Sequence, residues 1–166
     1  MATELYWDES GILTHYIADR LEINMDPREG GFIFFDKGKM IGAVRLYDQR
    51  GEGDCKQGTI MGVAESPRWF TRNTIRDVAT MFFAPPPYGL GLYRLNSFIN
   101  IDNKHSISVT KRIGFTEEGL LRGASAGRKD VMVLGMLREE CPWIGQEVYL
   151  QEDDQSETPV KNSGNS

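Results

Sequence analysis

The side chains best placed to do chemistry stand where a predicted strand meets a predicted helix, at Asn103 and Ser106. The Asn103 amide carries donors and an acceptor, so it suits an amide-bearing ligand that lies beside the strand end. Ser106 lies one helical turn further on the same face, so both side chains can point into one cleft. The competing interpretation is structural, with Asn103 as a plain helix cap and Ser106 facing solvent. The residues alone leave both interpretations open.

A second pattern, Gly-x-Ser-x-Gly at 123–127, matches the nucleophile elbow of hydrolases. That motif requires a helix directly after the serine and a histidine further along the chain. Here the β-rich run Val131–Leu134 follows instead, and both histidines, His15 and His105, come earlier. We therefore interpret 123–127 as a hairpin loop and not as a hydrolase site.

Apolar spacing predicts the elements that must position these residues. Helical stripes are expected at 8–21, from 73 to about 83, and at 103–113, and β-rich runs predict strands at 31–35, 40–47, 59–64, 92–101, 115–121 and 131–137. The first three strands form an antiparallel meander, whose first turn is at 36–39. Three prolines at 85–87 end the second helix. This order predicts a mixed α/β (α+β) domain.

The composition is that of an ordinary globular protein, with 166 residues, 40% of them apolar and 26% charged. We expect a single domain over 1–150 and a disordered acidic tail over 151–166. No apolar run is long enough to span a bilayer, so no membrane partner and a cytoplasmic address are expected. Cys55 and Cys141 lack the spacing of metal ligands, so no metal is expected.

The net charge of −5 is concentrated near one end of the chain. Residues 144–166 hold five acids and one base, which leaves 19 acids and 18 bases in the rest. A nearly neutral body lacks the clustered cations that nucleic-acid binding requires. Nucleic acid is therefore not an expected partner.

The pattern from Asn103 to Asp130 resembles the Gcn5-related N-acetyltransferase (GNAT) superfamily. An Asn-x-x-Ser motif opens a helix, Gly-Phe ends it, Glu-Gly-x-x-Arg lies on the next strand, and an Asp follows. The pattern is most similar to the branch of the ribosomal-protein N-terminal acetyltransferases RimJ and RimL, over residues 30–143. It implies a GNAT-like acyl-CoA N-acyltransferase fold, with a mixed, mostly antiparallel central sheet flanked by helices, and acetyl-CoA as co-substrate.

The resemblance implies that the acyl carrier lies between two diverging strands. Asn103 and Ser106 would lie at its pantetheine and thiol end, and strand 60–64 would lend backbone groups to the pantetheine. Ser106 would also protonate the departing thiolate as a weak general acid. Some relatives place a tyrosine seven residues after the Asn for this task, and Thr110 occupies that position here.

The pyrophosphate loop of the family, Arg/Gln-x-x-Gly-x-Gly/Ala before a helix, corresponds to 68–73 in this chain. Amides at a helix N-terminus bind phosphate, and Arg68 and Arg72 would neutralise its charge. Thr71 and Asn73 stand where glycines are expected. Glycine suits a loop whose backbone approaches the ligand closely or takes a positive φ, so β-branched Thr71 makes this loop degenerate. Thr71, Arg72 and Asn73 nevertheless remain in the expected cofactor-binding set, together with Arg68.

The resemblance also suggests which groups meet the acceptor. Glu65, at the end of the third strand, would act as general base or position a water, or would be an exposed strand-end acid. Asp130 would bind a substrate ammonium or brace Arg122. The expected activity is direct transfer of an acetyl group to a primary amine, either a protein N-terminus or a small amine, by a monomer or homodimer. The alternative is a GNAT-fold binding or structural protein that has lost transfer activity, of the kind that phage genomes carry.

Overall fold

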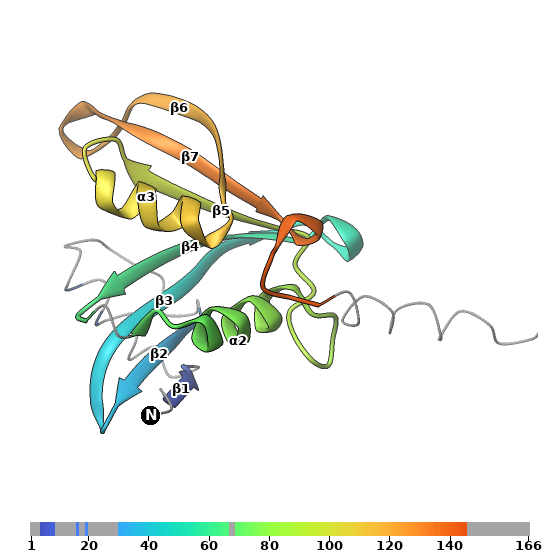
Figure 1. Ribbon diagram of the computed structural model, residues 1–166. Helices are drawn as coiled ribbons and strands as arrows, with labels where there is room; N and C mark the ends of the chain where they lie inside the picture. The colour runs from blue at the N-terminus through green and yellow to red at the C-terminus, as the bar shows by residue number, and fades with distance from the viewer. Residues whose placement is uncertain (1–3, 9–15, 17–18, 20–29, 67–68, 146–166) are drawn as a thin grey trace, which may run out of the picture.

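One seven-stranded sheet organises the computed structural model, which describes residues 4–8, 16, 19, 30–66 and 69–145 (Figure 1). The strand order is β1-β2-β3-β4-β5-β7-β6. Every neighbouring pair is antiparallel except β4 and β5, which are parallel. The strands are β1 (Glu4–Trp7), β2 (Gly31–Asp36), β3 (Lys39–Arg50), β4 (Gln57–Ala64), β5 (Arg94–Asn100), β6 (Thr116–Ser125) and β7 (Lys129–Leu137).

The meander predicted from the sequence is confirmed as β2, β3 and β4. Its first turn places Lys37 at φ 54° and Gly38 at φ 74°. Two successive positive φ values are typical of the two-residue turns whose twist matches that of a hairpin. A polar turn between two apolar runs therefore fixes the register of β2 and β3.

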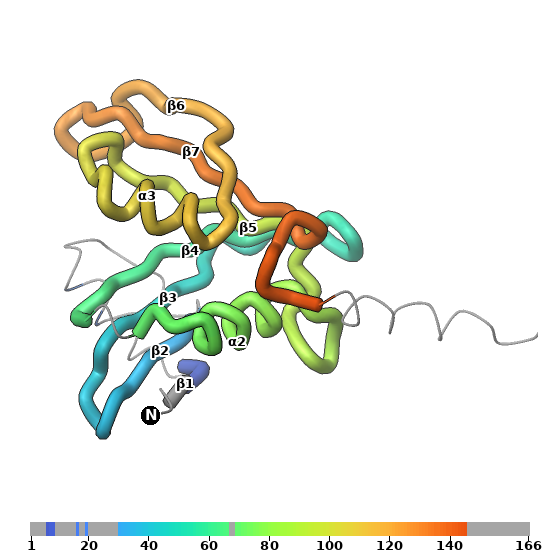
Figure 2. Tube along the Cα trace, in the orientation of Figure 1, coloured from blue at the N-terminus to red at the C-terminus, as the bar shows by residue number. Residues whose placement is uncertain are grey.

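Within residues 30–66 and 69–145, two α-helices flank the sheet, α2 (Arg72–Phe83) and α3 (Lys104–Ile113). Figure 2 shows α2 beside the β2–β4 half of the sheet and α3 beside the β5–β7 half. The apolar stripe of α2 packs on the sheet, where the rings of Phe82 and Phe32 lie 5.4 Å apart. The helix ends before Pro85, because proline disfavours a helical residue ahead of it. The ranges that the structure describes in full also include three short 3₁₀ turns: η1 (Gly53–Cys55), η3 (Ala126–Arg128) and η4 (Arg138–Glu140).

The parallel pair β4 and β5 separates shortly after it begins. Their pairing covers only Gln57–Thr59 on β4 and Arg94–Asn96 on β5. Beyond these residues the two strands diverge toward their C-terminal ends (Figure 1). The hydrogen bonding of the sheet is therefore interrupted between residues 60–64 of β4 and 97–100 of β5, and we call this unpaired stretch the opening.

The sequence predicted the later helices and six of the seven strands, with boundaries shifted by a few residues. Strand β1 was not predicted, since four residues are too few for a clear alternation. Of the expected helix at 8–21, only Asp8, Tyr16 and Asp19 are described, and the last two are helical. The segment 123–127 joins β6 to β7, as expected of a hairpin loop.

Candidate functional site

The opening between β4 and β5 is lined by backbone groups of β4. The Leu46 N–H donates to the Gly30 carbonyl, so the polar groups of Leu46 face β2 and not β4. Leu46 is opposite Ile60 in the register, so Ile60 also directs its N–H and C=O away from β3. The alternation repeats at Gly62, two residues further along. Beyond the short pairing with β5, these groups face the opening and can pair with an extended, amide-bearing chain.

The closed end of the opening is held together by side chains from several strands. The Asn96 amide donates to the Gln57 side-chain oxygen at 3.3 Å and to the Gly58 carbonyl at 3.4 Å. Arg94 donates to Asn96 at 2.7 Å and forms an ion pair with Glu118 on β6. This network fixes the point where the strands separate, and sequence analysis assigned none of it to the site.

One helix tip stands at the open end on the β5 side. Asn103 is the N-cap of α3, and its Oδ1 accepts the Ser106 N–H at 3.1 Å. The capping interpretation of Asn103 is therefore correct, and it leaves the side-chain NH₂ available as a donor. Asn103 is exposed and Ser106 is half-buried. The Asn-x-x-Ser motif thus builds the helix tip and still presents polar groups there.

The other helix tip, at α2, is capped by its own side chains. Oγ1 of Thr71 accepts the Thr74 N–H at 3.2 Å, and Oγ1 of Thr74 accepts the Thr71 N–H at 2.9 Å. Thr71 has φ −92°, so the loop closes without the positive φ that glycine would supply. The conformational objection to threonine is therefore removed. The capping box instead occupies two amides at this helix tip, those of Thr71 and Thr74, which an anion would otherwise use.

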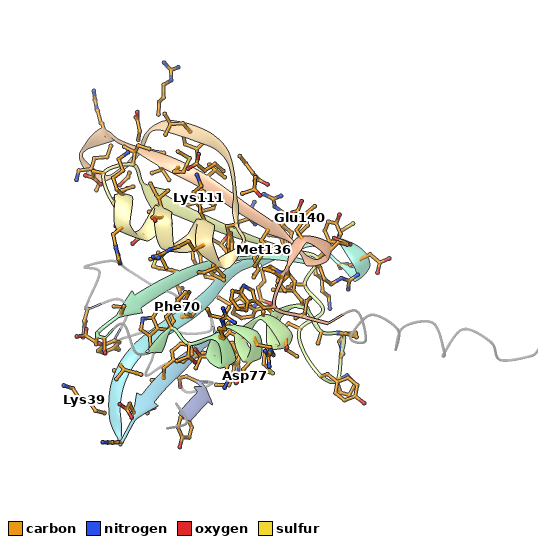
Figure 3. All side chains as sticks on the ribbon, in the orientation of Figure 1. Lys39, Phe70, Asp77, Lys111, Met136 and Glu140 are labelled. Carbon is orange, nitrogen blue, oxygen red and sulfur yellow. The ribbon has the colours of Figure 1, made fainter. Side chains whose placement is uncertain are left out.

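Two amides at this tip, those of Arg72 and Asn73, have no partner within the helix because they lie in its first turn. The loop before them is fixed by Trp69, whose ring lies 4.9 Å from that of Phe34. A Cβ at Gly42 would lie 2.7 Å from the Trp69 ring, so only glycine admits the indole there. Figure 3 labels the neighbouring Phe70 at the start of α2. Arg68, expected to bind phosphate, lies outside the described residues.

Cations gather along the first two turns of α2. Arg72 and Arg76, one turn apart, line a cavity of about 390 Å³, and neither forms an ion pair with any residue described here. The first turn of α2 also lacks an acidic residue, the usual complement of a helix N-terminus. Trp143 forms part of the far wall, held by a 2.6 Å bond from its Nε1 to the Ile113 carbonyl. The sequence analysis missed Arg76, although its i+4 spacing from Arg72 was a usable signal.

Glu65 lies one residue beyond β4, in a different pocket. One of its oxygens accepts the Tyr16 hydroxyl at 2.8 Å. The surrounding cavity, about 600 Å³, is lined by the β2–β3 hairpin and the end of β4: Tyr16, Asp36, Lys39, Met40, Ile41, Glu65 and Ser66. The lining residues come from the β3 side of β4, away from the opening. Glu65 therefore stands at the C-terminal end of β4, whereas the closed end of the opening is at Gln57–Thr59.

Asp130 lies at the start of β7, and its Oδ1 accepts the Gly123 N–H at 2.9 Å. It thus braces the β6–β7 turn through the backbone of Gly123, and its second oxygen, Oδ2, takes no part in this bond. Nearby, Asp102 pairs with the Lys129 ammonium at 2.6 Å. This hydrogen bond and its charge lower the pKa of the Asp102 carboxyl.

The described residues contain neither a metal-binding cluster nor a membrane-spanning helix. No group of three or more His, Cys, Asp or Glu side chains there could hold a metal ion. None of the helices within the described ranges is long and apolar enough to cross a membrane.

Solved structures share this architecture. A variant of the spermidine N-acetyltransferase of Vibrio cholerae matches with a TM-score of 0.65 at 19% identity, covering 87% of this chain and 99% of its own. The ribosomal-protein-S5-alanine acetyltransferase of Vibrio fischeri matches with a TM-score of 0.57 at 15% identity, covering 81% and 71%. A GNAT-family acetyltransferase of Streptococcus pneumoniae matches at 0.53 and 16%, covering 81% and 99%.

These likenesses define the class of fold: a mostly antiparallel seven-stranded sheet with flanking helices, as in GNAT acetyltransferases. No protein-family model and no curated protein matches the sequence. The fold expected from the sequence is confirmed as the GNAT fold. Identities below 20% leave the activity to be argued from the site.

Proposed function

We propose that this protein is an acyl-CoA-dependent N-acetyltransferase, which moves an acetyl group from acetyl-CoA to a primary amine by direct transfer. The observation that carries the proposal is the early end of the β4–β5 pairing at Thr59 and Asn96. It leaves polar backbone groups of a central strand facing an opening in the sheet. Gly62 and Ala64 are exposed there, so an extended amide-bearing arm could replace water as the hydrogen-bond partner of these backbone groups.

The anionic end of the carrier belongs at the α2 tip. The helix N-terminus offers the Arg72 and Asn73 amides, and the Arg72 and Arg76 guanidinium groups add charge along the same face. Cations at the positive end of a helix oppose its dipole, so their presence there is explained by an anionic ligand. The indole of Trp143 offers an apolar wall for the nucleotide end. Thr71 would contribute by fixing the shape of the helix tip, because both its hydroxyl and its backbone N–H are engaged in the capping box.

The acetyl transfer itself needs three groups in place. The amine nitrogen attacks the thioester carbonyl, the C–S bond breaks, and a proton leaves the nitrogen while the thiolate gains one. Glu65 lies in a pocket on the β3 side of β4, so it would accept the amine proton through water, and Ser106 would protonate the thiolate. Asn103 would direct its free NH₂ to a carbonyl of the pantetheine arm. No covalent enzyme intermediate is required.

The acceptor is an amine, either a protein N-terminus or a small molecule. A RimJ/RimL-like specificity for protein N-termini is suggested by the Asn-x-x-Ser to Asp pattern, which Asp130 completes. The half-buried carboxylate of Asp130, and the carboxylates of Asp36 and Glu65 in the pocket beside the β2–β3 hairpin, would suit a cationic substrate. The working unit is proposed as a monomer or homodimer with one domain over 1–150.

Thermal unfolding with and without acetyl-CoA tests the proposal first. A ligand at about 100 times its Kd stabilises the folded state by about 2.7 kcal/mol, which raises the Tm of a chain of this size by about 5–10 °C. A mass-spectrometric screen of peptides and small amines then detects an acetyl adduct. The absence of any Tm shift at millimolar acetyl-CoA contradicts the proposal, since the opening would then hold no carrier.

The second candidate is a GNAT-fold binding or structural protein without transfer activity. The Thr71–Thr74 capping box favours it, because the box satisfies a helix-tip amide without a ligand. The two candidates differ in turnover. Calorimetric binding of acetyl-CoA together with no acetylation of any amine in the screen supports this second candidate.

A further inference from the structure

The cavity on α2 adjoins the point where the described chain ends. Gly145, the last described residue, itself lines the cavity together with Arg72 and Arg76. The segment 146–166 that follows is strongly acidic. It carries five acids against the single base Lys161: Glu147, Glu152, Asp153, Asp154 and Glu157.

We propose that segment 146–166 docks on the Arg72–Arg76 face of α2 and competes there with the anionic end of the acyl carrier. The docking is argued from the opposite charges of the segment and the two arginines, and from the covalent link at Gly145. Only the competition depends on the proposed function. When no acyl carrier is bound, the carboxylates of the segment would neutralise the Arg72 and Arg76 guanidinium groups.

The covalent connection makes the contact reachable. Glu147 is two residues beyond Gly145, and Glu152 is seven, so at about 3.5 Å per residue they reach up to about 7 Å and about 25 Å. Because the segment is tethered at the rim of the cavity, its effective concentration there is about millimolar. No long loop has to close for the first carboxylate to meet a guanidinium.

The acidic segment is expected to bind Arg72 and Arg76 in preference to cations that already have an acidic partner. Arg94 and Lys111 already form ion pairs with Glu118 and Glu117. Arg72 and Arg76 have no such partner among the described residues, and they stand at the positive end of a helix. Exposed ion pairs are weak and screened by salt, so the segment would be displaced by a tightly bound polyphosphate.

The docking is tested in the full chain by paramagnetic NMR. A nitroxide is attached to Ser156→Cys in a Cys55→Ser background, and the Trp143 indole N–H is one of only three indole signals. We expect selective broadening of this signal at about 0.01 M salt and its recovery at about 1 M salt. Arg72→Gln with Arg76→Gln should abolish the broadening, while the matched control Arg112→Gln should keep it. Broadening that is absent, or that ignores salt and both arginines, overturns the docking.

The competition is tested by replacing the five acids with Gln or Asn. This variant should bind acetyl-CoA about three- to tenfold more tightly at low salt, and equally at high salt, whereas Lys161→Gln should not bind it more tightly. An unchanged Kd despite observed docking overturns the competition. If no variant binds acetyl-CoA while the salt-sensitive broadening persists, the proposed function fails and the docking stands.

Discussion

Replacing Thr71 by alanine distinguishes two roles of the α2 tip: stabilising the helix through its cap and binding a phosphate group. The change removes the oxygen that accepts the Thr74 N–H at 3.2 Å. Loss of a threonine cap costs about 1 kcal/mol, which lowers the Tm of a chain of this size by about 2–4 °C. The same change releases an amide at the tip of the helix. A hydrogen bond from that amide to a phosphate oxygen, worth about 1.5–3 kcal/mol, would tighten acetyl-CoA binding about tenfold or more.

Thr71→Ser is the matched control, because it keeps the hydroxyl and so keeps both Tm and affinity near those of the original chain. Differential scanning calorimetry gives the Tm of the free protein, and titration calorimetry gives the Kd for acetyl-CoA. The expected signature of Thr71→Ala is lower stability with higher affinity. Lower stability with unchanged affinity refutes the reasoning, since the capped amide would then not belong to a phosphate site. An unchanged Tm would mean that the cap contributes nothing.

Three other perturbations test separate groups. Glu65→Gln should lower kcat about 100-fold or more with an unchanged Kd for acetyl-CoA, if Glu65 is the base; an unchanged kcat excludes that role. A thiol reagent should modify exposed Cys55 rapidly and Cys141 only on unfolding, because burial covers the Cys141 thiol and raises its pKa; two fast equivalents in a colorimetric assay contradict this. Lys129→Ala should raise the pKa of Asp102 in an NMR titration, since the ammonium lowers it. The pair's stabilisation is present above the ordinary carboxyl pKa of about 3.9 and is lost as pH falls through the lowered pKa, so a pKa unmoved by Lys129→Ala is the contrary outcome.

Local patterns were sufficient for most of the elements. The polar turn around Gly38 and the apolar stripe of α2 each arise from residues close together in the chain. The Asn103 cap is equally local, because an amide that follows a strand can satisfy the first turn of a helix. These turns, stripes and caps can be predicted from the sequence because they do not depend on contacts with distant residues.

The arrangement of the site required the structure. That β4 and β5 separate after three residue pairs depends on the network around Asn96, whose members lie far apart in the chain. The resemblance to GNAT proteins implied diverging strands, but no spacing in the sequence did. At Thr71, where the family pattern led us to expect glycine, the structure has a capping box and a negative φ. Arg76 was recognised as a candidate site residue only from the structure, in which it lines the same cavity as Trp143.

The most direct test of the carrier site is amide NMR of β4 during titration with acetyl-CoA. Gly62 faces the opening and Gly119 lies on the β6 edge strand, so the two glycine signals compare the proposed site with an exposed strand elsewhere. We expect the Gly62 N–H to shift and to become protected from hydrogen exchange, while Gly119 stays unchanged. Saturable binding of acetyl-CoA that leaves Gly62 unprotected would contradict the claim that the opening between β4 and β5 holds the pantetheine arm.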